Sequence, residues 1–287
     1  MQTRQLGNKI VGAIGLGGMQ MSIEGRPDDR SQSIATIHAA LDAGITLIDT
    51  ANSYHIGADE VGHNETLIAE ALSTYGSDTS DVVVATKGGH LRPGDGSWTV
   101  DGSSRHLKQA VEASLKRLGV DAIDLYQFHR PDPKVAYDES IAALRDLLDE
   151  GKIRMAGISN ADTAQIRAAQ DMLGGRLASV QNEYSPRFRS SQPELELCDE
   201  MGIAFLPWSP FGGGSKADSL GSRHSAFADV AREHDVSPQR VTLAWMLAQS
   251  PVVIPIPGAS RPETIEDSAK AADLVLTADE VSRLDES

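Results

Sequence analysis

The segment IDLYQFHRPDPKVAYDESIAALRDLLDEGKIRMAGI, residues 123–158, carries the clearest indication of the fold class. It begins with an apolar, β-rich run (123–128) and continues through a stretch with the apolar period of an amphipathic helix (136–150). It then returns to a second apolar run (153–158). A strand, a helix and a strand in this order are typical of a parallel sheet. The segment therefore predicts one repeat of an α/β fold.

The same alternation runs along the whole chain. The predicted strands are 13–16, 46–49, 82–86, 123–128, 153–158, 178–181, 204–207 and 252–256. The predicted helices are 31–43, 64–75, 104–118, 136–150, 161–173, 192–201, 238–249 and 262–272. Eight such pairs match a (β/α)8 TIM barrel, whereas a doubly wound sheet usually stops at about five to seven strands. We therefore expect a (β/α)8 barrel.

The segments outside these pairs fit a single barrel domain over residues 1–287. The opening segment reads as a small hairpin around Asn8, which could plug the amino-terminal end of the barrel. No Pro/Ser linker, low-complexity tract or charge block indicates a second domain. Two long irregular stretches, 88–102 and 211–224, follow predicted strands at the end where barrel enzymes place their sites.

Charge and composition narrow the class of partner. The chain has 287 residues, is 40% hydrophobic and carries a formal net charge of −15. Nucleic acids and anionic membranes bind positive surfaces, so neither is an expected partner. A small-molecule substrate and a monomer are expected instead.

Cysteine content and the amino terminus bear on location. Cys198 is the only cysteine, so no internal disulfide can form, and its simplest interpretation is a small buried side chain. The first residues contain no apolar signal-peptide region, and no later run has the length of a membrane span. We expect a cytoplasmic protein.

Four polar residues lie at or near the ends of predicted strands: Asp49, Tyr54, Lys87 and His129. In a barrel these ends meet at one mouth. Reduction of a carbonyl group builds negative charge on oxygen, so the site must supply a proton and stabilise that charge. Tyr54 could donate the proton if the Lys87 ammonium lowers its pKa, with Asp49 holding Lys87. His129 could orient or polarise the carbonyl oxygen.

Each of the four residues also has a purely structural interpretation. Asp49 and Lys87 could form only a structural ion pair on adjacent strands. His129 could be a strand-end histidine with satisfied hydrogen bonds, and Tyr54 a loop aromatic with its hydroxyl in water. Their conjunction at one end of the barrel favours the catalytic interpretation.

Other common chemistries lack their motifs. AIGLGG (13–18) lacks the third glycine of a dinucleotide fingerprint, and GGGSK (212–216) lacks the spacing of a phosphate-binding P-loop. GISNA (157–161) and GASRP (258–262) both break the serine-hydrolase pattern. The first predicted strand offers no metal ligand, so no metal site is expected.

Five motifs, in order along nearly the full chain, resemble those of the aldo-keto reductase family. They are GITLIDTANSY (44–54), ATKG (85–88), LYQFH (125–129), GISN (157–160) and QNEY (181–184). The resemblance implies a (β/α)8 barrel, carbonyl reduction with NAD(P)H, and a catalytic tetrad. Its four roles fall on Asp49, Tyr54, Lys87 and His129.

The resemblance also implies residues for the nicotinamide end of a cofactor. Ser159, Asn160 and Gln181 would hold the carboxamide, although each could simply cap the next helix. Trp208 would stack on the nicotinamide ring, at a position where the family more often has tyrosine; alternatively it is a core aromatic at the barrel rim. Backbone amides of the glycine-rich loop that follows would cradle the pyrophosphate. That loop begins with Ser209, Pro210, Phe211 and Gly212.

The segment PIPGASRPETIEDS, 255–268, is the expected site for the adenosine 2′-phosphate. Ser260 and Glu263 fit a capping box with Arg261 in the first turn, so the segment could also be only a helix start. Thr264 stands where many members have arginine, and Ser268 where many have asparagine. NADPH is expected over NADH. The remaining residues assigned to the cofactor are Asp49, Gly18, Met19, Gly258 and Asp267.

The expected substrate pocket is framed by Tyr54, His55, Trp98, His129 and Trp208, with residues 88–102 as a wall. The chain has no extended carboxy-terminal loop, and in layout it resembles short bacterial members that reduce pyridoxal or sugar aldehydes. Two other functions stay open at this point. One is a nucleotide-binding regulatory subunit with feeble turnover; the other is NADP-dependent oxidation of an alcohol such as pyridoxine.

Overall fold

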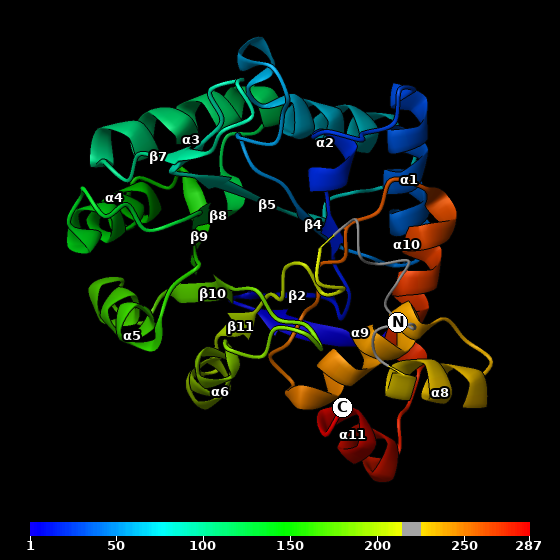
Figure 1. Cartoon of the computed structure of the whole chain (residues 1–287). Coiled ribbons are helices and arrows are strands. Elements are labelled where there is room, and N and C mark those ends of the chain that lie inside the picture. Colours follow the sequence, from blue (N-terminus) through cyan, green and yellow to red (C-terminus); the bar gives the residue numbers. More distant parts are fainter. Residues whose placement is uncertain (214–224) are drawn as a thin grey trace.

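The computed structural model describes residues 1–213 and 225–287, and a curled parallel sheet forms its centre (Figure 1). The sheet has seven strands in the order β11-β10-β9-β8-β5-β4-β3, with only parallel pairings between neighbours. These strands are β3 (Leu16–Gly17), β4 (Leu47–Asp49), β5 (Val83–Gly88), β8 (Ile123–Phe128), β9 (Ile153–Ser159), β10 (Leu177–Gln181) and β11 (Ala204–Phe205).

Residues 252–258 close the sheet into a barrel without forming a regular strand. On one side, Ile254 N donates to Phe205 O at 2.9 Å. On the other, Gly17 N donates to Pro257 O at 2.9 Å. Pro255 and Pro257 have no N–H to donate, so this segment cannot form the continuous series of backbone hydrogen bonds that a regular strand makes with its neighbours. The predicted (β/α)8 barrel is confirmed, and its eighth strand is an irregular connection in place of the predicted 252–256 strand.

Gly17 allows this closure because the backbone approaches it closely. A Cβ built on Gly17 would lie 2.8 Å from the backbone oxygen of Ile256, a separation that side-chain atoms do not tolerate. Glycine is therefore required where the first and last parts of the barrel meet.

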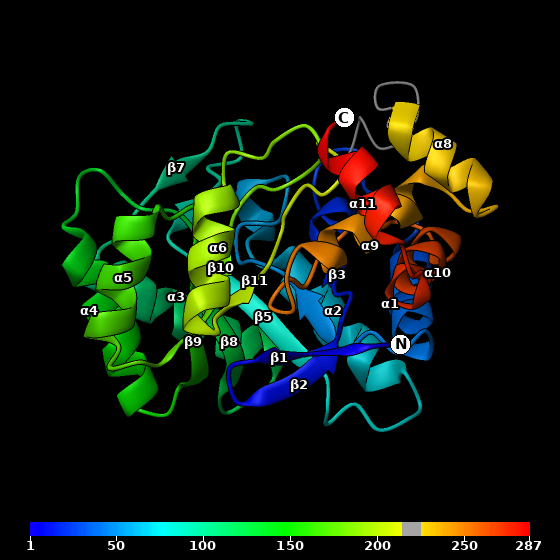
Figure 2. The same ribbon diagram turned by 90° about the horizontal axis from the view of Figure 1, so that it is seen from below.

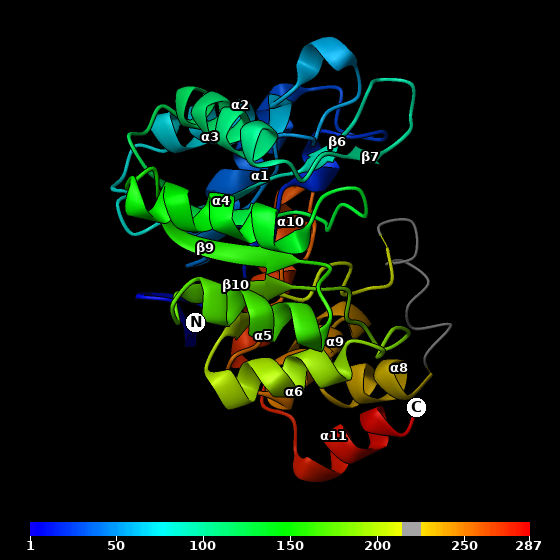
Figure 3. The same cartoon turned by 90° about the vertical axis from the view of Figure 1, so that its left-hand side faces the viewer.

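Helices surround the strands (Figures 1 and 3). The predicted ones are present as α1 (Arg30–Asp42), α2 (His63–Thr74), α3 (Ser104–Leu118), α4 (Tyr137–Asp149), α5 (Thr163–Met172), α6 (Gln192–Met201), α9 (Pro238–Gln249) and α10 (Pro262–Ala269). Two further helices were not predicted, α8 (Ser225–Glu233) and α11 (Ala278–Asp285). Short 3-10 turns occur at Met19–Met21, Ala58–Glu60 and Lys270–Asp273.

An amino-terminal hairpin lies across one end of the barrel (Figure 2). It consists of β1 (Thr3–Leu6) and β2 (Lys9–Gly12), paired antiparallel. Its Leu6 and Val11 are buried in the same apolar cluster as side chains of the barrel strands. Burying one such side chain contributes roughly 1.5–3 kcal/mol to the free energy of folding. Because these side chains pack against those of the barrel strands, the hairpin closes the barrel interior at this end. The opposite end remains for the site.

The stretch 88–102 is more ordered than the sequence indicates. It contains a short antiparallel hairpin of β6 (His90–Leu91) and β7 (Thr99–Val100). This hairpin lies beyond the carboxyl end of β5 and holds His90 and Trp98 next to each other, with ring centroids 4.7 Å apart. Within the predicted stretch 211–224, residues 214–224 lie outside the described residues. None of the helices described here is long and apolar enough to span a bilayer.

Candidate active site

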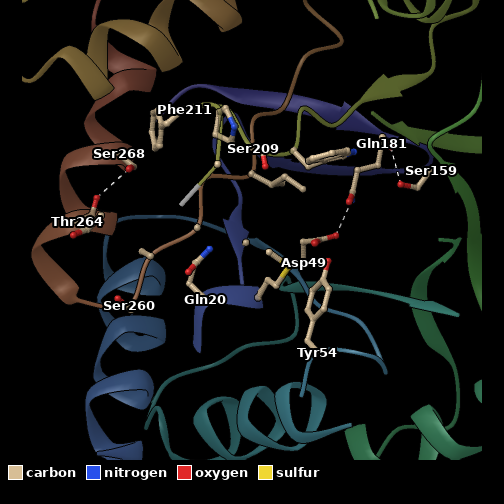
Figure 4. Close-up of a pocket in the computed structure, with 18 of the residues that line it drawn as sticks. Gln20, Asp49, Tyr54, Ser159, Gln181, Ser209, Phe211, Ser260, Thr264 and Ser268 are labelled. Atoms are coloured by element: carbon tan, nitrogen blue, oxygen red, sulfur yellow. Dashed lines mark hydrogen bonds between the residues drawn. The ribbon is translucent and has the colours of Figure 1, made fainter. Parts of the chain in front are cut away.

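Three neighbouring strands bring the four predicted catalytic residues together. β4 ends at Asp49, β5 carries Lys87 near its end, and His129 directly follows β8. Because parallel strands end on the same side, these side chains meet at the mouth opposite the hairpin. Tyr54 reaches the same place from the loop after β4, and Figure 4 shows its phenol beside Asp49.

Lys87 is the centre of the cluster. Its side chain is fully buried and its ammonium donates three hydrogen bonds: 2.6 Å to Asp49 Oδ2, 2.8 Å to Thr50 O and 3.1 Å to Tyr54 Oη. Three donors therefore have three partners. Burial opposes the charge on Lys87, but the attraction of Asp49 and Tyr54 outweighs it and raises the pKa of Lys87. The ammonium form is favoured.

Asp49 is held from its other oxygen as well. Oδ1 accepts hydrogen bonds from Gln181 Nε2 at 2.8 Å and from Gln127 Nε2 at 3.3 Å. The carboxylate is almost completely buried, and its partners come from β5, β8 and β10. A buried ion pair with this many hydrogen bonds is rigid, so the position of Lys87 is fixed across four strands.

Lys87 lowers the pKa of Tyr54, as predicted, but the net pKa is raised above the ordinary value. Burial is the largest effect and raises the pKa of Tyr54; the nearby Asp49 carboxylate raises it further, and Lys87 only partly offsets both. Asp49 at 2.6 Å neutralises much of the ammonium's field at the phenol. Tyr54 is consequently a protonated phenol, which can donate a proton.

His129 is a neutral imidazole. Burial, followed by the charge of Lys87, keeps its pKa well below the usual value. Its ring meets Tyr54 edge-on at 5.9 Å and His90 edge-on at 4.8 Å. His129 Nδ1 is buried and has no hydrogen-bond partner among the described residues. The pKa of His90 falls to about 4, first through burial and then through Arg130, so it is neutral too.

A cavity of about 790 Å³ extends from these residues to α10 (Figure 4). Most of the predicted site residues line it: Met19, Asp49, Tyr54, Trp98, His129, Ser159, Asn160, Gln181, Trp208, Ser209, Pro210, Phe211, Gly258, Ser260, Arg261, Thr264, Asp267 and Ser268. Lys87 lies behind this wall through its bond to Tyr54.

Besides Lys87, three predicted residues are not part of the cavity wall. Gly18 uses its backbone within the protein, donating to Asp49 O at 2.8 Å and accepting from Asn64. His55 is buried and its Nδ1 lies 2.7 Å from Gly57 O, so its side chain is engaged in the loop and does not frame the substrate end. Gly212 also lies outside the wall, whereas its neighbour Gly213 contributes to it.

Polar groups gather where β9 and β10 end. Ser159 Oγ donates to Gln181 O at 2.7 Å (Figure 4), and Asn160 Nδ2 donates to His129 O at 3.0 Å. Asn160 has φ +57°, a left-handed conformation that asparagine tolerates better than most residues. The neighbouring Trp208 is half-buried, and its Nε1 has no partner among the described residues.

The α10 end of the cavity differs from the predicted capping box. The N-cap is Arg261 and not Ser260, no side chain caps the helix, and Pro262 occupies the first turn. The backbone N–H groups of this turn are therefore free of side-chain caps, and Arg261 stands exposed beside them. Asp267 is bound to Arg240 and to Ser237 Oγ, so its charge is compensated. Ser268 Oγ donates to Thr264 O at 3.0 Å.

Sequence reasoning missed several residues that line the cavity, among them Gln20, His90 and Arg130. His90 and Arg130 both follow strand ends, which was an available signal. Gln20 lies in a 3-10 turn that the sequence pattern does not reveal. No group of three or more His, Cys, Asp or Glu side chains in residues 1–213 and 225–287 is arranged to hold a metal ion.

Comparison with known proteins gives a consistent result. The family model described as Aldo/keto reductase family matches residues 13–287. The chain is 35% identical over 287 residues to an uncharacterized oxidoreductase of Schizosaccharomyces pombe, covering 99% of this chain and 89% of that protein. It is 36% identical to 6-dehydroglucose reductase of Novosphingobium aromaticivorans, covering 93% and 89%. It is 30% identical to pyridoxine 4-dehydrogenase of Escherichia coli, covering 99% and 97%.

Solved structures are similar over the full length as well. An aldo/keto reductase from Klebsiella pneumoniae in complex with NADP and acetate has a TM-score of 0.82 at 28% identity, covering 99% of this chain and 94% of that one. The glycerol dehydrogenase AKR11B4 from Gluconobacter oxydans has a TM-score of 0.84 at 26% identity, with the same coverage.

Proposed function

The chain belongs to the aldo/keto reductase family and is an NAD(P)H-dependent oxidoreductase, and on that premise we propose that it reduces an aldehyde or ketone to an alcohol with NADPH, Tyr54 donating the proton. One observation carries this proposal. Lys87 Nζ lies 3.1 Å from Tyr54 Oη, and both groups are buried at the floor of the cavity. A protonated phenol beside an ammonium can release a proton to a neighbouring alkoxide.

The residues of the cavity fit a nicotinamide dinucleotide. About 790 Å³ is within the roughly 300–1,000 Å³ that small-molecule sites occupy. One end offers amide and hydroxyl groups of Ser159, Asn160 and Gln181 beside the flat face of Trp208. The other end offers the amino terminus of α10 and Arg261, which favour an anion. A polar amide and a phosphate match these two ends.

The proposed chemistry assigns each residue a step. A reduced nicotinamide, when bound, supplies the hydride. Tyr54 Oη gives its proton to the carbonyl oxygen, and the Lys87 ammonium stabilises the phenolate that remains. Asp49 keeps Lys87 in place, and neutral His129 presents a ring nitrogen that can hydrogen-bond the same oxygen. Lys87 therefore acts on the phenolate formed by the reaction more than on the resting phenol.

We infer a preference for NADPH over NADH from Arg261. Its guanidinium stands at the α10 end, where a 2′-phosphate would need a cation. Thr264 and Ser268 supply only hydroxyl groups there. The test is to compare the Kd values of NADPH and NADH for the native protein and Arg261→Gln. The variant is expected to weaken NADPH roughly tenfold and NADH much less; equal losses for both would refute this role.

The activity test is purified protein with NADPH and a panel of aldehydes and ketones, followed by nicotinamide absorbance. The named relatives make sugar carbonyls and pyridoxal sensible members of the panel, and pyridoxine with NADP a test of the reverse direction. Turnover of at least one pair is expected. Cofactor binding without turnover of any aldehyde or ketone with NADPH, or of pyridoxine with NADP, would favour the regulatory-subunit alternative.

A further inference from the structure

Arg130 is a cation at the substrate end that forms no ion pair with any residue of 1–213 or 225–287. It directly follows His129 and lines the cavity, yet it is exposed rather than tucked into the fold. Its one hydrogen bond within the described part of the chain is to Asn160 Oδ1, at 3.2 Å. No carboxylate of the described residues lies within ion-pair distance of it. This lack of an ion pair is notable because the chain carries a formal net charge of −15 and is therefore rich in carboxylates.

Asn160 holds the guanidinium in one position. Its Nδ2 donates to His129 O and to Ser159 Oγ, both at 3.0 Å, which fixes the orientation of the amide. The amide oxygen then points at Arg130 and retains a second lone pair for another donor. Arg130 thus has one hydrogen bond that holds its guanidinium toward the cavity wall, and its remaining N–H groups can bind an anion.

The rest of the substrate end is close to electrically neutral. Asp49 and Lys87 compensate each other at 2.6 Å. His90 and His129 are neutral, and the positive charge of Arg130 contributes to lowering both of their pKa values. The other charged wall residues, Arg261, Glu263 and Asp267, belong to the α10 end. Arg92, whose guanidinium lies 5.0 Å from the Trp98 ring centroid, is paired with Glu24. Among the described residues, Arg130 is therefore the unpaired charge at the substrate end.

We propose that this enzyme prefers carbonyl substrates that carry an anionic group, a carboxylate or a phosphate, and that Arg130 binds that group. The inference rests on the proposed function, because it concerns the substrate of the same site. Trp98, stacked on His90, supplies a flat aromatic surface on the wall of the same cavity. A substrate with a carbonyl at one end, a short apolar body and an anion at the other matches these groups.

The test uses two matched pairs of aldehydes with NADPH. One pair is 4-carboxybenzaldehyde and its neutral methyl ester; the other is glyceraldehyde 3-phosphate and glyceraldehyde. The native enzyme is expected to have a kcat/KM roughly tenfold or more higher for the anionic member of at least one pair, the size of a charge-assisted hydrogen bond. Which pair shows it distinguishes a carboxylate from a phosphate. The preference is expected to shrink as NaCl rises from about 0.02 M to about 0.5 M.

Variants assign the effect to this side chain. In Arg130→Gln the ratio of kcat/KM for the anionic and neutral members is expected to fall to near one, while Arg130→Lys retains part of it. The matched control is Arg154→Gln, which removes the same charge from the start of β9, at the other end of the barrel. Its ratio is expected to equal that of the native enzyme.

The outcomes separate the two proposals. Equal kcat/KM within both pairs, or an anionic preference that survives Arg130→Gln, overturns the role of Arg130 and leaves the reductase function standing. Absence of NADPH oxidation with all four aldehydes and the wider panel overturns the proposed function, and this inference with it.

Discussion

The ammonium of Lys87 donates a hydrogen bond of 3.1 Å to the phenol oxygen of Tyr54, and no water-filled gap separates the two buried side chains. In the proposed mechanism, Tyr54 gives this hydroxyl proton to the carbonyl oxygen of the substrate. Its replacement is the most direct test of the chemistry.

Tyr54→Phe removes the proton donor and keeps the aromatic ring. We expect kcat for aldehyde reduction to fall roughly 100- to 10,000-fold, the usual contribution of a general acid, with the Kd of NADPH changed little. Steady-state kinetics and fluorescence titration measure the two quantities. Tyr75→Phe, which loses only the hydroxyl bonded to Asp42 on the surface, is the control. Native turnover in Tyr54→Phe would exclude this residue as the donor.

Lys87→Met should destabilise the protein, because it leaves the buried Asp49 without its ion-pair partner. Breaking such a pair costs about 3–5 kcal/mol in the free energy of unfolding. The double variant Asp49→Asn/Lys87→Met removes the stranded charge and is expected to recover part of the loss. Urea unfolding of the native protein, both single variants and the double variant measures the coupling. Strictly additive losses would show that the two charges do not interact.

The reduction rate should be insensitive to pH over the neutral range. Burial raises the pKa of Tyr54 above its ordinary value near 10, so the donor stays protonated there. Burial lowers the pKa of His129 well below 6.5, so that group does not titrate there either. We expect kcat/KM for reduction to be flat between about pH 6.5 and pH 9. Alcohol oxidation, which requires the phenolate, should become faster as pH rises.

One result would contradict this predicted pH profile. A fall in reduction with an apparent pKa between about 7 and 9 would mean that the phenol is more acidic than its surroundings imply. The expectation from the sequence, that Lys87 lowers the pKa of Tyr54 toward neutral pH, would then hold.

Stability should decline below neutral pH because of buried histidines. His90 and His129 have lowered pKa values, first through burial, and so do His55, His63 and His106. The unfolded chain binds protons near pH 6.5 whereas the folded chain resists them, so stability is full above that pH and is lost as pH falls; for His90 the loss extends toward pH 4.

Urea unfolding between pH 7 and pH 4.5 tests this linkage. The free energy of unfolding should decrease with falling pH, and the decrease should be smaller in His90→Asn, which has no group to protonate there. A free energy that is constant or increases over this range would contradict the assignment.

The sequence was sufficient to predict that Asp49, Lys87 and His129 lie close together, because they lie at strand ends and parallel strands place these ends together. Their catalytic roles stay predictions. The sequence was insufficient for the direction of the Tyr54 pKa. That direction depends on burial and on the distance between Asp49 and Lys87, neither of which is a property of local sequence. The monomeric state, the cytoplasmic location and the single domain over 1–287 stay predictions.

Smaller errors in the fold have local causes. β6 and β7 are two residues each, too short to produce an alternating pattern. The start of α11 could have been predicted, since Thr277 and Glu280 form a capping box. The helix lies outside the eight strand–helix pairs, so the pattern of alternating elements did not indicate it. At α10, Pro262 fixes the first turn, and the cap falls on Arg261 rather than the hydroxyl-bearing Ser260.

The irregular segment 252–258 joins β11 to β3, so the barrel seam is made by parts of the chain more than 200 residues apart. Closing a loop of this length costs conformational entropy before these contacts can form. The two walls of the cavity, Met19 on one side and the start of α10 on the other, therefore come together only when this seam forms. A ligand that contacts both walls of the cavity stabilises the folded state, so the melting temperature should rise with the ligand concentration.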